Sequence, residues 1–442
     1  MLARSSVSSR GAAVRDIQRR APLSADFSRL WVAQGAGVAA AQVAELALPL
    51  LAVLMLNASA LELGLLGVAR WLPFLLLALP LGVLVDRHRR RPMIVISDWG
   101  RAALTVAIIA LAVAGVLTTP ALLLLAAAIG CFTVLFEVSY QSIVPSVVPP
   151  SGLERANSRL AATAAAVQVG GPGLGGMLVQ LISAPLALLV TAVGYVVSAV
   201  SVTGIRAPES PSTSRAGFAT ELREGMSYVR RDKYLVANLG FSALYNPFIQ
   251  WVMVLFLLHA VEQLGLDAFQ VGLILAIGAT GALAGSLLAG PLVRRFGAGR
   301  PILWTAVAEC FVLLLLPVAD ASWGAPALVI VLGLVFAVGD AGATLSSVIL
   351  ITIRQLRTPD HLLGRVNASM RWVSYGTIAF GAAAGGIVGE LVGTQLGILI
   401  GVLLTFSAVI WVALGPLPRV GDPTDLAIAE RREQEASALA AG

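Results

Sequence analysis

The chain has few charges, few cysteines and no nucleotide-binding loop, and each scarcity excludes a class of protein. Charged residues make up 12% of the 442 positions, whereas soluble domains carry roughly 25%, so the composition does not fit a water-soluble protein. The two cysteines, Cys131 and Cys310, fall in different apolar runs, which argues against a disulfide framework or a metal site. No segment matches G-x-x-x-x-G-K-[ST], so ATP is not expected to drive the protein directly.

Hydrophobic residues are abundant instead, at 58% of the chain. Apolar runs of about 20 residues recur along its length, and each is long enough to cross about 30 Å of hydrocarbon as a helix. We therefore expect an all-α membrane protein whose twelve transmembrane helices form two pseudo-symmetric six-helix bundles. The expected spans are residues 29–56, 61–85, 93–117, 120–144, 157–182, 185–205, 234–260, 268–293, 301–318, 325–350, 372–393 and 395–415.

Basic residues set the expected orientation. Apart from Arg70, every Lys and Arg lies before the first span or after an even-numbered one, provided that Arg29, Arg101 and Arg371 are placed at the cytoplasmic ends of their spans. The positive-inside rule then puts both termini in the cytoplasm and the chain in the cell inner (plasma) membrane. Residues 1–28 contain five arginines and no apolar stretch, so we expect no cleavable signal peptide. This topology explains the net charge of +6, and no nucleic-acid partner is expected.

The longest polar break helps to divide the chain into five expected regions. Residues 1–28 form a cytoplasmic N-terminal tail, and residues 29–206 form the first bundle. Residues 207–233 form a cytoplasmic linker whose second part has the apolar period of an amphipathic helix. That helix either lies on the membrane surface or is an ordinary solvated linker helix. Residues 234–418 form the second bundle, and residues 419–442 form a cytoplasmic C-terminal tail.

The two halves of the chain repeat. Glycines return at matching places: Gly64 and Gly82 recur 208 positions later as Gly272 and Gly290, and Gly171, Gly175 and Gly176 recur 210 positions later as Gly381, Gly385 and Gly386. Matching glycines in matching spans indicate a duplicated six-helix unit. Two such bundles around a central site are typical of transporters.

The loop after the second span contains Gly82, Asp86, Arg87, Arg90 and Arg91 in the order G-x-L-x-D-R-x-x-R-R. This segment resembles the loop motif that the major facilitator superfamily carries between spans 2 and 3. A glycine lets two helices approach closely, and the arginines hold the loop at the cytoplasmic face. The resemblance implies a gating loop that favours the outward-open state, not a substrate site.

Further segments narrow the resemblance. Residues 354–371 look like the loop before span 11 in the enterobactin-exporter-like and macrolide-efflux-like branch of that superfamily, and residues 47–49 and 145–157 resemble the same branch. The likeness covers nearly all of residues 29–415. It implies export driven by the proton gradient, without a bound cofactor. We expect a small-molecule substrate, protons and the lipid bilayer as partners, and no obligate protein partner.

A glycine-rich segment in span 5 contains Gly171, Pro172, Gly175 and Gly176. It resembles the core of the antiporter motif G-x3-G-P-x2-G-G, but Val167 stands where the leading glycine would be. The proline allows a kink and the glycines permit close helix packing. The segment is therefore evidence for an antiporter or an instance of ordinary small-residue packing.

Arg70 lies inside an expected span, where a cation needs a partner or a watery cavity. It is about 9 residues from the outer end of span 2, and Glu45 is about 11 from the outer end of span 1, so both lie roughly 14–17 Å deep. The short hairpin between these spans makes a buried ion pair geometrically possible. Either this pair competes with proton or substrate binding, or it is a permanent structural contact.

Three more acids fall inside expected spans. Glu137 is in span 4 and Asp340 is in span 10, and in the resembled superfamily these spans line the cavity. Both acids are therefore candidates for proton coupling or substrate binding. Glu309 is in span 9, a peripheral helix in that superfamily, so a structural role is favoured for it.

Aromatic and polar side chains in spans 4 and 7 are the remaining candidates for the cavity wall. Tyr140, Tyr245 and Trp251 could cradle an amphipathic substrate, and Asn246 adds a polar group beside a proline kink. Aromatic residues on helices more often pack against neighbours, which is the alternative for each of them.

The function that these features favour is secondary active export of a bulky, partly apolar small molecule, such as a drug, siderophore or secondary metabolite, by alternating access. An uptake permease or uniporter on the same fold is the alternative, because fold alone does not fix direction. A membrane scaffold without transport is a remote third possibility, and an enzyme is not expected.

Overall fold

The computed structural model describes residues 24–148, 152–207, 218–423 and 425–426, and within them the chain is helical without a strand. The helices are α2 (Ala25–Leu56), α3 (Ala60–Arg87), α4 (Arg90–Val113), α5 (Thr119–Val147), α6 (Leu153–Ile182), α7 (Ala184–Thr203), α8 (Phe218–Arg231), α9 (Lys233–Glu262), α10 (Ala268–Phe296), α11 (Gly299–Leu313), α12 (Ala325–Leu356), α13 (Asp360–Val392) and α14 (Thr394–Leu414), with short 3-10 helices η2 (Ala321–Trp323) and η3 (Leu417–Arg419).

Eleven of the described helices are long and apolar enough to cross a membrane. The twelfth expected span is α11, which has 15 residues and continues into hydrogen-bonded turns as far as Ala319. Several boundaries differ from expectation by four or more residues, and at two helix starts the reason is that polar residues extend the helix beyond the apolar run that marks it. Helix α13 begins at Asp360 instead of residue 372, and α6 begins at Leu153 instead of residue 157.

The helix ends repeat between the halves, which explains why the two bundles look alike. At the start of α3, Ser59 and Glu62 form a capping box. At the start of α10, Asp267 and Gln270 form the same capping box 208 positions later. Each box satisfies backbone N–H groups that the first helical turn leaves free. The sequence repeat is therefore a repeat of local structure.

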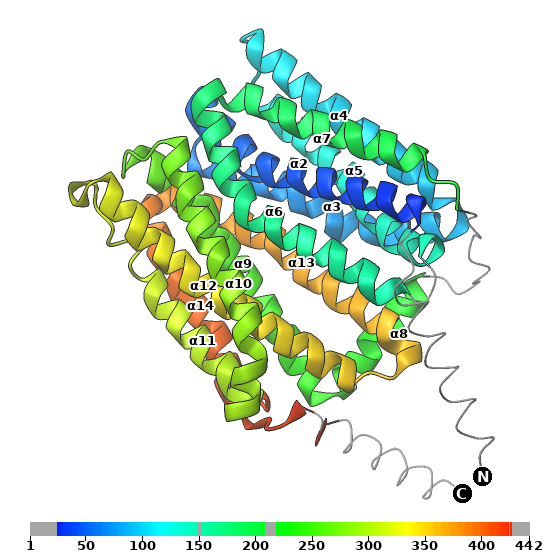
Figure 1. Cartoon of the computed structure of the whole chain (residues 1–442). Coiled ribbons are helices and arrows are strands. Elements are labelled where there is room, and N and C mark those ends of the chain that lie inside the picture. The colour runs from blue at the N-terminus through cyan, green and yellow to red at the C-terminus, as the bar shows by residue number, and fades with distance from the viewer. Residues whose placement is uncertain (1–23, 149–151, 208–217, 424, 427–442) are drawn as a thin grey trace, which may run out of the picture.

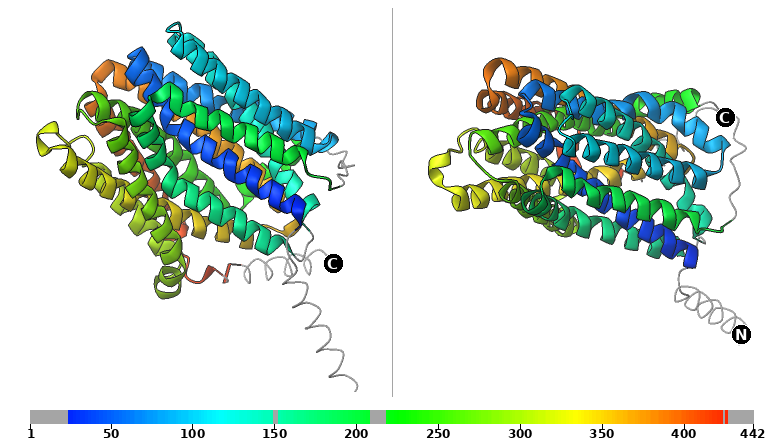
Figure 2. Two further views of the ribbon diagram at one scale, coloured as in Figure 1. Left: turned by 45° about the horizontal axis from the view of Figure 1, so that its top comes forward. Right: turned by 90° about the horizontal axis from the view of Figure 1, so that it is seen from above.

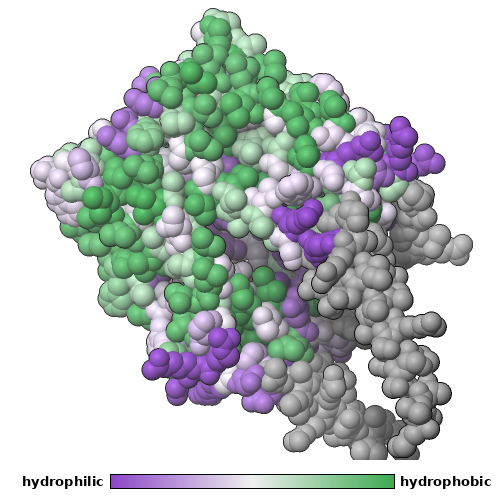
Figure 3. Space-filling view, in the orientation of Figure 1, coloured by the Kyte–Doolittle hydropathy of each residue, from purple (hydrophilic) through white to green (hydrophobic). Residues whose placement is uncertain are grey.

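The helices run side by side along one long axis, and the chain folds back at two ends of the molecule (Figures 1 and 2). We call the end that carries α8 the α8 face and the other end the far face. Helices α3, α5 and α12 end at the α8 face, and α13 begins there. The side of the molecule seen in Figure 3 is largely apolar between the two ends, and apolar side chains are exposed along the length of helices, such as Leu287 of α10, Phe380 of α13 and Leu403 of α14. Such a belt is the surface that contacts lipid tails.

The first bundle comprises α2 to α7 and the second comprises α9 to α14, and two helix crossings join them, α3 with α13 and α6 with α10. Both crossings are made by glycines in the half toward the far face. A Cβ atom on Gly64 would lie 2.7 Å from Gly386 Cα, and one on Gly176 would lie 2.8 Å from Gly272 Cα. Any larger residue would push the helices apart.

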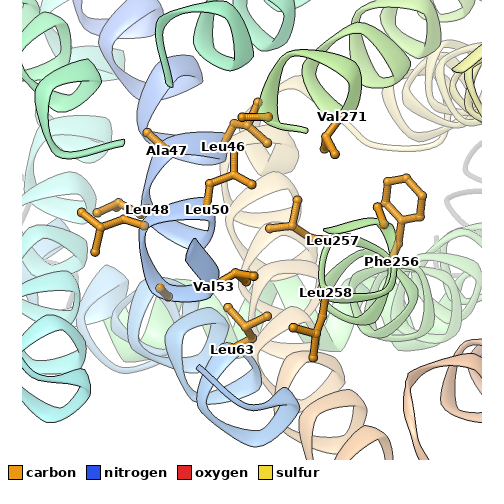
Figure 4. Packing of buried hydrophobic residues seen from close by; sticks show 14 of the residues in the cluster. Leu46, Ala47, Leu48, Leu50, Val53, Leu63, Phe256, Leu257, Leu258 and Val271 are labelled. Carbon is orange, nitrogen blue, oxygen red and sulfur yellow. The ribbon is translucent and has the colours of Figure 1, made fainter. Parts of the chain in front are cut away.

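Apolar packing shows which end of the molecule is closed. Toward the far face, one buried cluster includes Leu50 and Leu63 of the first bundle and Leu257 and Leu258 of the second (Figure 4). Toward the α8 face, the buried clusters around Phe27 and around the second bundle's α11 each stay within one bundle. The bundles therefore pack together at the far face and separate toward the α8 face.

Helix α8 is fastened to the second bundle. Its Val229 is fully buried with Val366 and Met370 of α13. The Arg365 guanidinium lies 2.5 Å from the Glu224 carboxylate, and the Tyr228 hydroxyl donates a hydrogen bond to a carbonyl of the α12–α13 loop. The apolar side of this helix thus contacts protein where a membrane-surface helix would contact lipid. Residues 208–217 of the expected linker, most of both tails and the two chain ends lie outside the described residues.

Candidate functional site

A central hollow of about 140 Å³ lies between the bundles, on the far-face side of their middle. Its first-bundle wall includes Glu45 of α2 and Arg70 of α3, and Gln250 of α9 faces it from the second bundle. The Arg70 guanidinium donates to the Glu45 carboxylate, so the hairpin brings the two together. The Glu45 side chain is 53% exposed and that of Arg70 is 21% exposed. The expectation that this pair is buried is wrong, because it borders the gap between the bundles.

A larger cavity of about 580 Å³ opens between the bundles toward the α8 face. Glu137 and Gln141 of α5 lie on its first-bundle wall, where the Gln141 amide lies 3.4 Å from the Glu137 carboxylate. Arg354 of α12 and Arg371 of α13 lie on the second-bundle wall. Glu137, a candidate from the sequence, therefore faces a cavity. The sequence did not predict that two arginines would line the opposite wall.

Aromatic side chains border the same region. The rings of Trp71, Phe74 and Tyr375 form a cluster with centroids 5.4 to 5.7 Å apart. Trp372 lines the cavity and donates a hydrogen bond of 2.9 Å to the Leu75 carbonyl, which links α13 to α3. Sequence reasoning missed this cluster because its members come from helices about 300 positions apart, and no local pattern marks them.

In the second bundle, a tyrosine connects the cavity to a buried acid. Tyr245 lines a hollow of about 300 Å³ on α9 and α12, and its hydroxyl donates a 2.6 Å hydrogen bond to Glu309 of α11. Glu309 is only 3% exposed. Asp340 of α12 points toward Gly278 of α10 and makes no hydrogen bond or ion pair within the described residues. Tyr245 is thus positioned between this hollow and two acids, a link that the sequence did not indicate.

Two other candidates from span 7 differ in their surroundings. Asn246 lines the same hollow as Tyr245 and donates a 3.3 Å hydrogen bond to the Ser374 carbonyl. Trp251 is 5% exposed, packs against the glycines of α13 and α14, and donates to the Gly397 carbonyl at 3.0 Å. The expectation that Trp251 faces the cavity is wrong, because those glycines leave a slot on the opposite side of α9 that the indole fills.

Tyr140 of α5 lies beside a fourth hollow, of about 470 Å³, which opens in the α8-face half of the first bundle. Its ring stacks on Phe136, with centroids 5.7 Å apart. Its hydroxyl is buried without a hydrogen-bond partner within the described residues. A buried hydroxyl of this kind is available to a ligand or to water.

A second charged pair lies inside the first bundle. Arg101 pairs with Asp98 on α4, and both are almost fully buried. The Ser198 hydroxyl donates to Asp98 at 2.6 Å, and the Arg101 guanidinium lies 4.1 Å from the centre of the Phe136 ring and 4.3 Å from that of Tyr195. Arg101 is about 16 Å along α4 from its first residue. Its expected place at the end of the span is therefore wrong, and its partners explain how it is tolerated.

The gating-loop motif is described only in part. Gly82 lines the large cavity, Arg90 and Arg91 begin α4, and the Arg91 guanidinium donates to the Thr203 carbonyl. The side chains of Asp86 and Arg87 lie outside the described residues. A latch role for this loop stays a prediction.

Two glycines of the antiporter-like segment, Gly171 and Gly176, make tight contacts. A Cβ atom on Gly171 would lie 2.6 Å from Gln42 Cβ, whereas one on Gly175 would lie 3.6 Å from Val43 Cα, an ordinary van der Waals distance. Gly176 forms the crossing with α10, and Pro172 borders the central hollow. Within the described part of the chain, no group of three His, Cys, Asp or Glu residues is arranged to hold a metal ion.

Two helical bundles around a cavity with charged walls define a multi-pass membrane transporter, not an enzyme. The chain belongs to the Major Facilitator Superfamily, whose family model matches residues 30–377 and 250–440. A comparison with curated protein sequences found no significant match.

Solved structures of transporters share the fold. A mutant of the nucleoside transporter NupG is 12% identical with a TM-score of 0.72, and the match covers 88% of this chain and 99% of that one. A bacterial homologue of the iron transporter ferroportin in its inward-facing state is 16% identical with a TM-score of 0.70, covering 89% and 99%. The outward-facing structure of such a homologue is 20% identical with a TM-score of 0.56, and the match covers 88% of this chain and 98% of that one.

Proposed function

We propose that the chain is a proton-coupled exporter of a bulky, partly apolar small molecule, such as a drug, siderophore or secondary metabolite. The observation that supports this most is the pair of Glu45 and Arg70, which borders the central hollow instead of being sealed in a core. A carboxylate that water and substrate can reach is able to exchange its partner for a proton. A fully buried pair could not do so without a large desolvation cost.

The transport cycle follows from the packing. In the observed arrangement, substrate enters from the α8 face into the cavity beside Glu137. Rocking of the bundles would close that face and open the glycine crossings at the far face. Protonation of Glu45 or Glu137 from the far side would then weaken attraction to the substrate and release it. We place the α8 face on the cytoplasmic side of the inner membrane, because basic residues concentrate at that end.

Two features favour export over uptake. The segment Gly171 to Gly176 resembles the antiporter motif, and residues 354–371 resemble the enterobactin-exporter-like and macrolide-efflux-like branch. Uptake or uniport on the same fold is the competing function. The nucleoside and metal transporters of similar fold show that the fold serves several substrates.

A substrate-accumulation screen in an efflux-deficient host, with and without an uncoupler, tests the proposal. Cells that make the protein should retain less of at least one amphipathic compound than cells with an empty vector. The uncoupler should abolish the difference, since it removes the proton gradient. If no compound is retained less, export is contradicted; if retention stays low with the uncoupler, proton coupling is contradicted.

A further inference from the structure

The large cavity toward the α8 face has opposite charges on its two walls. On the first-bundle wall, Glu137 of α5 contacts the uncharged Gln141. On the second-bundle wall, Arg354 of α12 and Arg371 of α13 line the same cavity. Both guanidinium groups are positively charged and lie on the same wall of the cavity. The space between the walls is thus a polarised site of about 580 Å³, enough for a molecule of drug size.

Neither Arg354 nor Arg371 meets a carboxylate within the described residues, in contrast to five other arginines of the described chain. These five are Arg29, Arg70, Arg101, Arg357 and Arg365. The Arg354 guanidinium instead lies 3.8 Å from the Met370 sulfur, and its Nε is buried without a partner in the described residues. Arg371 lies over the Tyr375 ring at 5.3 Å. Two cations beside a cavity call for an anion that the described chain does not supply.

A third polar group in the cavity also lacks a partner. Asn367 of α13 lines the cavity, and its side-chain oxygen is buried without a hydrogen bond within the described residues. Phe74, Trp372 and Tyr375 give the same cavity an apolar, aromatic lining. Charged and amide groups at fixed positions on an aromatic wall are the usual composition of a small-molecule site.

We propose that this cavity binds an amphipathic zwitterion, whose anionic group contacts Arg354 and Arg371 and whose cationic group contacts Glu137. The inference rests on the proposed transport function and adds the charge class of its substrate. A planar guanidinium suits a carboxylate or phosphate oxygen pair, and a single carboxylate suits an ammonium or iminium group. One molecule then contacts both bundles, so its arrival and departure act on their separation.

Dye binding to the purified full-length protein in detergent tests the proposal. Rhodamine B carries a cationic ring system and a carboxylate, and rhodamine 6G carries a similar cation with an ester in place of the carboxylate. Fluorescence anisotropy should show about tenfold tighter binding of rhodamine B, the effect of one charge-assisted contact. Arg371→Gln should abolish that preference by weakening the binding of rhodamine B, and it should not weaken the binding of rhodamine 6G, which has no anionic group to lose a contact. Glu137→Gln should weaken both dyes, because both are cationic.

Matched variants separate the charge effect from misfolding. Arg300→Gln changes an exposed arginine at the α10–α11 corner and should leave both affinities unchanged. Arg371→Lys should give an intermediate loss, and Arg354→Gln repeats the test if Arg371→Gln does not purify as a single species. The proposal is overturned if the wild type binds neither dye, binds both equally, or keeps its preference in the arginine variants. Charge-selective binding without proton movement in vesicles would contradict proton coupling and leave this inference standing.

Discussion

Charged residues inside the bundles fall into two kinds, those that are sealed in packing and those that border a cavity. Asp98 and Arg101 belong to the first kind, with side chains at most 3% exposed. Glu45 and Arg70 belong to the second. Burial fixes the role of the first pair as structural, whereas access to the cavity makes the second pair available for chemistry.

Replacing one member of the sealed pair should be costly. Arg101→Met leaves the Asp98 carboxylate buried beside Ser198 without its cation, which we expect to lower the free energy of unfolding by about 3–5 kcal/mol. Arg29→Met, at a pair that is partly exposed, should cost less than about 1 kcal/mol. Unfolding in detergent, followed by tryptophan fluorescence, measures both. Equal losses of unfolding free energy in the two variants would show that burial does not decide how much each pair contributes to stability.

Replacing the cavity-lining acid should affect coupling more than stability. Glu45→Gln keeps the size of the side chain and removes its ability to take up a proton. We expect transport driven by a pH gradient to fall by at least tenfold, while exchange of substrate without a gradient persists. Glu262→Gln, at the exposed end of α9, is the matched control. If transport by the Glu45→Gln variant kept the wild-type dependence on pH, the pair of Glu45 and Arg70 would have a structural role.

At the scale of helices, the corner between α6 and α7 has a serine where its repeat has a glycine. Ser183 has φ 82° and ψ 158°, and Gly393, which occupies the same place between α13 and α14, has φ 85° and ψ 163°. Only glycine adopts this backbone region without strain. The second bundle thus has the unstrained version of the corner.

Ser183→Gly should therefore stabilise the protein. Relief of backbone strain outweighs the added freedom of glycine in the unfolded chain, so we expect a gain of about 1 kcal/mol. The reciprocal variant Gly393→Ser should lose a similar amount. Thermal unfolding of both variants in the same detergent checks the pair. A decrease for Ser183→Gly would contradict the strain argument.

The glycine crossings should control the far face. Gly176→Leu forces α6 from α10, where a Cβ atom already lies within 2.8 Å of Gly272 Cα. We expect the far face to open and a cysteine at Leu257 to react at least tenfold faster with a maleimide, with Cys131 and Cys310 replaced by alanine. Gly170→Leu is the control, because no atom lies within 4 Å of a Cβ there. Equal labelling of the two variants would mean that the crossings do not hold this face shut.

What the sequence could predict depended on how local the signal is. The spans and the 208-residue repeat follow from hydropathy and spacing, and Glu45 meets Arg70 because a short hairpin joins their helices. The direction in which a side chain faces depends on neighbours distant in sequence. Trp251 turns toward glycines of α13 and α14, and Arg101 lies deep beside Phe136 and Tyr195. Neither environment leaves a mark near the residue in the sequence.

For the whole molecule, the arrangement of bundles relates the charges to a transport cycle. The far face is closed by one apolar cluster that both bundles share, and the α8 face opens onto a cavity with charged walls. In the proposed cycle, a substrate bound there contacts helices of both bundles, and a proton at Glu45 or Glu137 changes the charge that the substrate meets. Coupling of substrate to protons is therefore the central claim.

Proton movement in reconstituted vesicles tests this claim most directly. Proteoliposomes are loaded with a pH-sensitive dye at an acidic internal pH and placed in neutral buffer, and a substrate found in the accumulation screen is added outside. The account predicts that the internal pH rises as substrate enters, and that Glu45→Gln abolishes the rise. Substrate entry at the same rate with and without the pH gradient, or acidification of the interior on substrate entry, would contradict it.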